Sequence, residues 1–170
     1  MKILIAEDEK NILVPYKIIL ESRNHEVHTV EDGEKCIQIY RQEFDKLNNS
    51  DKNIHPFDIV ILDYKMPKKD GLEVAKEIFE LVPDQRIVFA SAYIKNILVN
   101  STEKLKQATE MLQKPFSLDT LVDKVEDKEL FAQLEAYGIC MPNPKKQPTH
   151  RQLIKILEEL LEVEKKYIDE

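Results

Sequence analysis

Residues 57–63 read FDIVILD, an apolar run that ends in a carboxylate. Residues 59–62 are all apolar and mostly β-branched, which is typical of a strand covered on both faces of a parallel sheet. Asp63 is expected where this strand leaves the sheet, because an ionised carboxylate inside an apolar sheet is very costly. In open α/β sheets the carboxyl ends of the strands form the edge where ligands bind. The segment therefore predicts an α/β fold with Asp63 at its functional edge.

A second acidic group, Glu7-Asp8-Glu9, follows another apolar strand, predicted for residues 2–6. Because the ends of parallel strands share one edge of the sheet, acids at two such ends favour a shared divalent cation. Asp8 and Asp63 have the oxygen ligands that Mg²⁺ prefers, and Glu7 could act through a coordinated water. One oxygen of Asp63 would then remain free to attack phosphorus and form an aspartyl phosphate.

Two further strand ends carry polar groups. Ser91 ends the strand predicted for residues 86–90, and Lys114 ends the one predicted for residues 110–113. A transferring phosphoryl group needs donors aimed at its oxygens, and a hydroxyl and an ammonium are suitable donors. Taken singly, each residue would more often be a cap, a turn or an exposed side chain. Their joint placement at successive strand ends favours the functional interpretation.

Strand-like and helix-like segments alternate along the first 126 residues. The expected strands span residues 2–6, 26–30, 57–62, 86–90 and 110–113. The expected helices span residues 11–22, 33–44, 72–81 and 118–125, with a polar connector over 48–55. A loop and a short helix capped by Ser101 or Thr102 are expected between residues 93 and 108. Five such units with right-handed crossovers predict an α/β fold, a five-stranded parallel doubly wound sheet between two layers of helices.

Local signals support the predicted helix ends. Asn24 suits a left-handed exit from the first helix, and Asp32 and Ser117 can cap the helices that follow them. Pro15 removes a helix hydrogen bond unless it lies in the first turn, so it predicts a start near Lys10 or a slight bend.

These motifs resemble the receiver domain of two-component response regulators over residues 1–126. The four motifs stand in the order of that family. They are ILIAEDE at residues 3–9, DYKMP at 63–67 with Asp70-Gly71, FASA at 89–92 and KPF at 114–116. The resemblance implies a flavodoxin-like receiver fold, and Asp70-Gly71 is interpreted as a turn without chemistry.

By this resemblance, Asp63 is the phosphoacceptor and takes phosphate from a sensor histidine kinase or a phosphotransfer protein. The Mg²⁺ ligands would come from Glu7, Asp8, Asp63 and the backbone carbonyl of Lys65. Ser91 and Lys114 would contact the phosphoryl group, and the peptide bond from Lys114 to Pro115 would be cis, as is usual in the family.

Three residues near the predicted site distinguish this chain within the family pattern. Met111 stands three residues before Lys114, where the family often has an aromatic side chain that moves with the hydroxyl residue. A flexible thioether can fill either pocket, so this departure puts the usual aromatic switch in doubt. Lys65 and Tyr93 flank the site at positions where the family tunes the loss of phosphate.

Residues 127–170 are predicted to form a helical extension. It begins with a helix over 127–137, which Gly138 stops. A proline-rich linker of about 139–148 follows. The extension ends in an amphipathic helix over about 150–168, which a Thr149–Gln152 capping box opens. One apolar stripe of the last helix has the spacing of a coiled-coil seam. This stripe consists of Leu153, Ile156, Leu160, Val163 and Tyr167. A second stripe widens the apolar face beyond what a two-stranded seam needs. Two interpretations stay open: the helix packs on its own receiver domain or on the 127–137 helix, or it forms a homo-oligomer, which is slightly favoured because so short a chain offers little surface of that width.

Composition limits the possible partners and location. The net charge of −7 argues against nucleic acid as a partner, and the short apolar runs argue against a membrane span. The first apolar stretch ends at Glu7, too early for a secretory signal. Cys36 and Cys140 form neither a metal-binding pair nor a disulfide framework. We therefore expect a reduced, cytoplasmic protein.

We expect the protein to act as a response regulator in a two-component phosphorelay and to signal through protein–protein interaction or oligomerisation. No enzymatic activity is expected beyond self-catalysed phosphorylation and dephosphorylation. A phosphatase or mutase of the haloacid dehalogenase type needs a second aspartate two residues after the first, where this chain has Lys65. A nucleotide-binding fold needs a glycine-rich loop after the first strand, which is missing. A scaffold with a locked receiver is disfavoured by the complete set of site residues.

Overall fold

The computed structural model describes residues 1–47, 55–93, 109–139 and 150–168. They belong to two compact units, Met1–Leu121 and Val122–Glu170. The predicted short helix after Ser101 or Thr102 and the capping residue Thr149 lie outside the described residues, as does most of the connector and of the linker. Within the described part of the chain, none of the helices combines the length and the apolar character required to span a bilayer.

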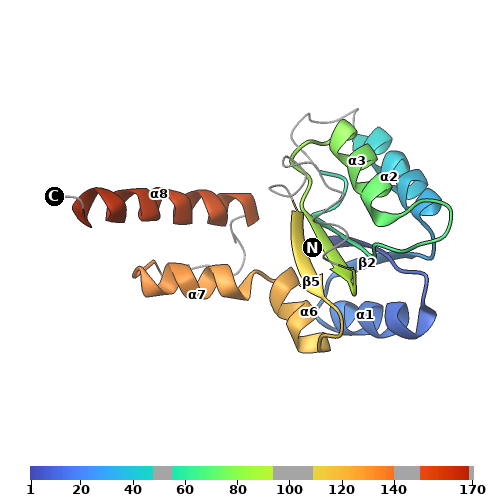
Figure 1. Cartoon of the computed structure of the whole chain (residues 1–170), viewed down its shortest axis with the longest axis horizontal. Helices are drawn as coiled ribbons and strands as arrows, with labels where there is room; N and C mark the ends of the chain where they lie inside the picture. The colour runs from blue at the N-terminus through green and yellow to red at the C-terminus, as the bar shows by residue number, and fades with distance from the viewer. Residues whose placement is uncertain (48–54, 94–108, 140–149, 169–170) are drawn as a thin grey trace. The chain divides into compact units, whose positions relative to one another are not determined.

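Five parallel strands form one sheet in the order β2-β1-β3-β4-β5 (Figure 1). Their bounds are β1 (Lys2–Ala6), β2 (Glu26–Val30), β3 (Ile59–Leu62), β4 (Ile87–Ser91) and β5 (Thr109–Gln113). Ala6 at the end of β1 pairs with Val30 and with Leu62, and Ser91 at the end of β4 pairs with Gln113. The carboxyl ends of all five strands therefore lie at one edge, which confirms the predicted sheet.

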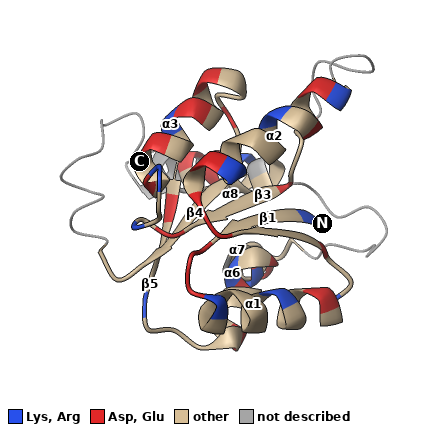
Figure 2. Ribbon diagram, turned by 90° about the vertical axis from the view of Figure 1, so that its right-hand side faces the viewer, with Lys and Arg blue, Asp and Glu red and all other residues tan. Residues whose placement is uncertain are grey.

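Helices cover both faces of the sheet (Figures 1 and 2). The helix α1 (Lys10–Ser22) lies on one face, and α2 (Gly33–Leu47) and α3 (Gly71–Leu81) lie on the other. Alternate residues of a strand point to opposite faces. Leu4 of β1 accordingly belongs to the core beneath α2 and α3, and its neighbours Ile3 and Ile5 are buried on the side of α1. A sheet buried on both faces explains the continuous apolar strands.

The first two helices begin where the sequence predicted. The helix α1 starts at Lys10 and contains Pro15, and Asn24 after its end has the expected left-handed backbone with φ of 62°. Asp32 caps α2, because its Oδ1 accepts a hydrogen bond of 2.8 Å from the backbone N–H of Lys35.

The start of α3 corrects one prediction. Asp70-Gly71 is not only a turn, since Asp70 caps α3 and Gly71 is its first residue. The carboxylate of Asp70 accepts from the backbone N–H of Glu73 (2.8 Å), and the Glu73 carboxylate accepts from the backbone N–H of Asp70 (3.0 Å). This capping box begins α3 one residue earlier than expected and fixes the end of the loop that follows Asp63.

The second unit contains the end of α6 (Leu118–Val125) and the helices α7 (Lys128–Ala136) and α8 (His150–Ile168). Figure 1 shows α7 and α8 side by side with their N-terminal ends together. Asp127 precedes α7 and His150 begins α8. Oδ1 of Asp127 and Nδ1 of His150 lie 2.7 Å apart. Leu134 of α7 and Leu153 of α8 are buried, so the first turns of α8 pack on its own chain.

Candidate functional site

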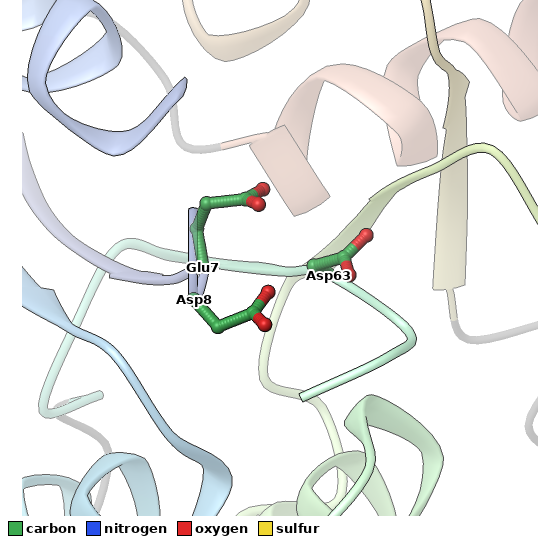
Figure 3. Close-up of side chains that lie close together, drawn as sticks. All are labelled: Glu7, Asp8 and Asp63. Carbon is green, nitrogen blue, oxygen red and sulfur yellow. The ribbon is translucent and has the colours of Figure 1, made fainter. Parts of the chain in front are cut away.

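Three carboxylates meet just beyond the ends of β1 and β3 (Figure 3). Glu7, Asp8 and Asp63 each offer one oxygen, and these oxygens all lie within 4.8 Å of one another. A backbone hydrogen bond of 2.9 Å from the N–H of Asp63 to the carbonyl of Ala6 keeps the two strand ends aligned. The structure thus brings together the two acidic groups of the sequence.

The three carboxylates differ in their exposure. Asp8 is exposed, whereas Glu7 and Asp63 are buried. Burial raises the pKa of Glu7 even though the neighbouring Lys114 opposes this shift. Oε1 of Glu7 is buried and has no hydrogen-bond partner among the described residues. A buried, unpartnered carboxylate oxygen beside two other carboxylates fits a bound hard cation, which prefers oxygen ligands.

Lys114 brings a positive charge into this cluster from the end of β5. Its Nζ lies 2.5 Å from Oε2 of Glu7 and 3.2 Å from Oδ1 of Asp63, and its side chain is only 15% exposed. Burial lowers the pKa of Lys114, but the hydrogen bond to Glu7 and the charges of both carboxylates outweigh it, so this pKa is raised overall. Lys114 is therefore a cation held directly against the predicted phosphoacceptor.

Ser91 occupies the end of β4, as predicted. It is buried, and its Oγ accepts a hydrogen bond of 3.2 Å from the backbone N–H of Tyr93. The main chain of β4 and β5 joins here, because the N–H of Lys114 donates to the carbonyl of Ser91 at 3.1 Å. The Lys114–Pro115 peptide bond is cis, as the resemblance implied.

Lys65 contacts Asp63 through its backbone. The N–H of Lys65 donates to Oδ2 of Asp63 at 3.0 Å, so this oxygen is oriented by the loop that follows the strand. The Nζ of Lys65 lies 4.0 Å from the centre of the Tyr93 ring, a cation–π contact between the loops after β3 and β4. The role of the Lys65 carbonyl as a metal ligand stays a prediction.

Tyr16 is a neighbour of the site that the sequence reasoning missed. Its ring is buried on α1 and stacks on Phe116 with 5.5 Å between the ring centres. Burial raises the pKa of Tyr16, and the charges of Glu7 and Asp63 raise it further, so the phenol stays neutral beside the acidic cluster. The available signal in the sequence was its helical spacing, because Leu13, Tyr16 and Leu20 follow one another at intervals of three and four residues on the buried face of α1.

The chain is similar to known response regulator receiver proteins. The family described as response regulator receiver domain matches residues 3–126. The chain is 26% identical to the response regulator receiver protein CpdR of Brucella abortus over 125 residues, which cover 74% of this chain and 93% of CpdR. It is 32% identical to the transcriptional regulatory protein PdtaR of Mycobacterium tuberculosis over 130 residues, or 74% of this chain and 55% of PdtaR.

Solved structures agree with these sequence relatives. The response regulator protein TrrA from Thermotoga maritima, solved in complex with Mg²⁺ and BeF, is 32% identical and superposes with a TM-score of 0.56. The match covers 74% of this chain and 96% of TrrA. A receiver domain from Clostridium thermocellum is 26% identical with a TM-score of 0.58 over 76% of this chain and 97% of that domain. With its parallel sheet, its acidic cluster and a family match over residues 3–126, the chain belongs to the response regulator receiver family of two-component systems.

Proposed function

We propose that Asp63 accepts a phosphoryl group from a sensor histidine kinase or a phosphotransfer protein, in a reaction that depends on Mg²⁺. The observation that supports this most directly is the geometry around Asp63. One of its oxygens faces the ammonium of Lys114, the other accepts from the backbone of Lys65, and the carboxylates of Glu7 and Asp8 lie beside it. Such a site orients the nucleophile and supplies compensating positive charge.

In the proposed step, an oxygen of Asp63 attacks the phosphorus of a phosphohistidine. A P–O bond forms on Asp63 while the P–N bond to the donor breaks and its electron pair stays on the histidine. Lys114 shifts from its contact with Glu7 toward the phosphoryl oxygens, and the hydroxyl of Ser91 donates to them. The side chain of Lys114 already touches both carboxylates, so this shift needs only a change of partner.

The acidic cluster is the proposed place of the cation. Glu7, Asp8, Asp63 and the carbonyl of Lys65 would hold Mg²⁺, which would neutralise charge on the phosphoryl oxygens during transfer. TrrA was solved with Mg²⁺ and BeF, and this relative supports the same ligand for the present chain. We propose no further catalytic activity beyond the self-catalysed gain and loss of phosphate.

Intact-protein mass spectrometry tests the phosphoacceptor. After treatment with acetyl phosphate and Mg²⁺, the wild-type chain should gain one phosphoryl group, and EDTA should suppress the gain. Asp63→Asn, which keeps the size of the side chain and removes the nucleophile, should gain none. A phosphorylated Asp63→Asn protein would show that another residue is the acceptor.

The output of the receiver is proposed to pass through α8, by self-association or a change of protein partner. The helix α8 has 19 residues and α7 has 9, so their lengths are about 29 Å and about 14 Å. The helix α7 alone is therefore too short to pack along the full length of α8. Leu161 lies in the second half of α8 and is 41% exposed, so it is a suitable position at which to test contact with a second copy.

Light scattering of the full chain with and without Mg²⁺ and beryllofluoride tests this output. We expect the molar mass to change on addition of beryllofluoride, a mimic of the acyl phosphate. Leu161→Lys should reduce the molar mass of the oligomer, and Glu162→Gln, which makes the same change of charge at a neighbouring exposed position, should not. A mass of one chain under every condition would refute self-association.

A further inference from the structure

Two loops that are distant in sequence touch each other beside the acidic cluster. The backbone N–H of Gly33, at the start of α2, donates to the carbonyl of Pro67 at 3.4 Å. A Cβ added at Gly33 would lie 2.2 Å from the carbonyl oxygen of Lys69, so only glycine permits this approach. The start of α2 thus lies directly against loop 64–70, the segment that leads from Asp63 to α3.

An ion pair joins the same two elements. The Nζ of Lys68 lies 3.1 Å from Oδ2 of Asp32 and 3.3 Å from the Glu34 carboxylate. The carboxylate of Asp32 is fixed independently, because it is buried and its Oδ1 caps α2 through the N–H of Lys35. This capping bond and the Lys68 ammonium hold the pKa of Asp32 below its usual range, so the pair is charged at neutral pH. Lys68 is therefore tied to a rigid helix end.

The backbone of Lys68 makes this contact unusual. Its φ of 68° lies in the left-handed region, where glycine or asparagine is the less strained choice. The side chain of Lys68 is about half exposed, and ion pairs of this kind contribute little to stability. Stability alone therefore does not account for a lysine here, whereas the reach of its side chain across the two loops does.

We infer that Lys68 and Asp32 are positioning residues, which clamp loop 64–70 to α2 and so hold the Lys65 peptide against Asp63. The inference rests on the proposed Mg²⁺ site. A hydrogen bond of 2.9 Å from the N–H of Gly71 to the carbonyl of Tyr64 joins the two ends of this loop. With the loop closed in this way and clamped to α2, the N–H of Lys65 stays on Oδ2 of Asp63, which holds the peptide whose carbonyl is the proposed metal ligand.

The substitution Lys68→Asn separates positioning from simple charge effects. Asparagine tolerates the left-handed backbone but cannot reach Asp32. Loss of a cation near the site should by electrostatics alone strengthen the binding of Mg²⁺. Loss of the clamp should instead weaken it by up to about fivefold, because removing an ion pair worth at most about 1 kcal/mol cannot change the affinity by more. The two explanations therefore predict opposite signs.

Isothermal titration with MgCl₂ supplies the first readout. Lys35→Gln removes the other cation near Asp32 (3.7 Å) without touching the loop, and it should leave the affinity unchanged or slightly higher. Lys68→Arg keeps the charge and the reach, and it should restore an affinity close to that of the wild type. If Lys68→Asn binds Mg²⁺ as tightly as the wild type or more tightly, the inference is wrong.

Hydrogen exchange in EDTA supplies a readout without metal. In Lys68→Asn the amides of residues 64–71 should exchange faster, while those of α1 and the midpoint of global unfolding stay unchanged. Unchanged exchange in the loop would overturn the clamp. Absence of Mg²⁺ binding by the wild-type chain would instead refute the proposed metal site, and the exchange experiment would still decide on the clamp.

Discussion

Replacing Lys114 by methionine tests whether its ammonium and a divalent cation serve the same carboxylates. The Nζ of Lys114 lies 2.5 Å from Glu7 and 3.2 Å from Asp63. Methionine keeps much of the aliphatic side chain and removes the charge. The variant then leaves three carboxylates, with oxygens within 4.8 Å of one another, without the cation that compensates them.

The expected loss follows from these distances. At 4.8 Å and an effective dielectric constant of about 20, each pair of carboxylates repels by about 3.5 kcal/mol. Solvent around the exposed Asp8 screens part of this repulsion, and loss of Lys114 removes a charge that opposes the burial-raised pKa of Glu7, so this pKa should rise further in the variant. We expect the free energy of unfolding in EDTA to fall by about 2–3 kcal/mol, somewhat less than for breaking a fully buried ion pair.

Mg²⁺ should reverse most of this loss. Without the ammonium as a competitor, the cluster should bind Mg²⁺ at least about tenfold more tightly, so the ion should stabilise Lys114→Met by about 1.4 kcal/mol more than it stabilises the wild type. Urea unfolding followed by circular dichroism, in EDTA and in excess Mg²⁺, measures both quantities. Lys17→Met removes a half-exposed lysine of α1, which pairs only with Glu21 of the same helix among the ion pairs of the described residues, and is the control. Equal losses in EDTA and in Mg²⁺ would refute the shared role of the carboxylates.

Three further predictions concern single residues. Asp8→Asn should abolish most of the increase in melting temperature caused by Mg²⁺, because it removes one of the three clustered carboxylates, and an undiminished shift would exclude Asp8 as a ligand. Gly71→Ala should destabilise the protein by about 1–3 kcal/mol in urea unfolding, since its Cβ would lie 2.2 Å from the carbonyl oxygen of Asp63, and an unchanged free energy of unfolding would contradict the packing argument. Hydrogen bonds from Lys2 and then Lys46 lower the pKa of Glu43 from 4.5 to about 2. The contribution of ionised Glu43 to the free energy of unfolding is therefore present above pH 4.5 and is lost as the pH falls toward 2. Glu43→Gln should lower this free energy by up to about 1 kcal/mol at pH 7 and leave it unchanged near pH 2, and a loss that persists in acid would contradict the assignment.

The sheet and the place of the site could be predicted from the sequence because both depend on local patterns. The apolar run before Asp63 fixed a buried strand and its exit, and the fourth and fifth strands ended at Ser91 and just before Lys114 as expected. The observed bounds of β3, β4 and β5 differ from the predicted ones by one or two residues. The predicted start of the third strand at residue 57 precedes β3, although the backbone N–H of Asp58 already donates to the carbonyl of Lys2.

The pairings inside the site could not be predicted, because they join segments that are far apart in the chain. Residue types alone did not show that Lys114 prefers the closer contact with Glu7 over Asp63, or that Lys68 reaches back to Asp32. The capping box at Asp70 was missed for a different reason. A turn and a helix cap use the same residues, and the turn interpretation overlooked Glu73, whose spacing of three residues from Asp70 is the sequence signal of a capping box.

A crystal structure of the chain with Mg²⁺ and beryllofluoride would show whether the acidic cluster and Lys114 act on Asp63 as proposed. We expect beryllium on an oxygen of Asp63, the cation among Glu7, Asp8, Asp63 and the Lys65 carbonyl, and the ammonium of Lys114 moved from Glu7 onto a fluoride. Beryllofluoride bound away from Asp63, or Lys114 still paired with Glu7 and remote from the fluorides, would contradict it.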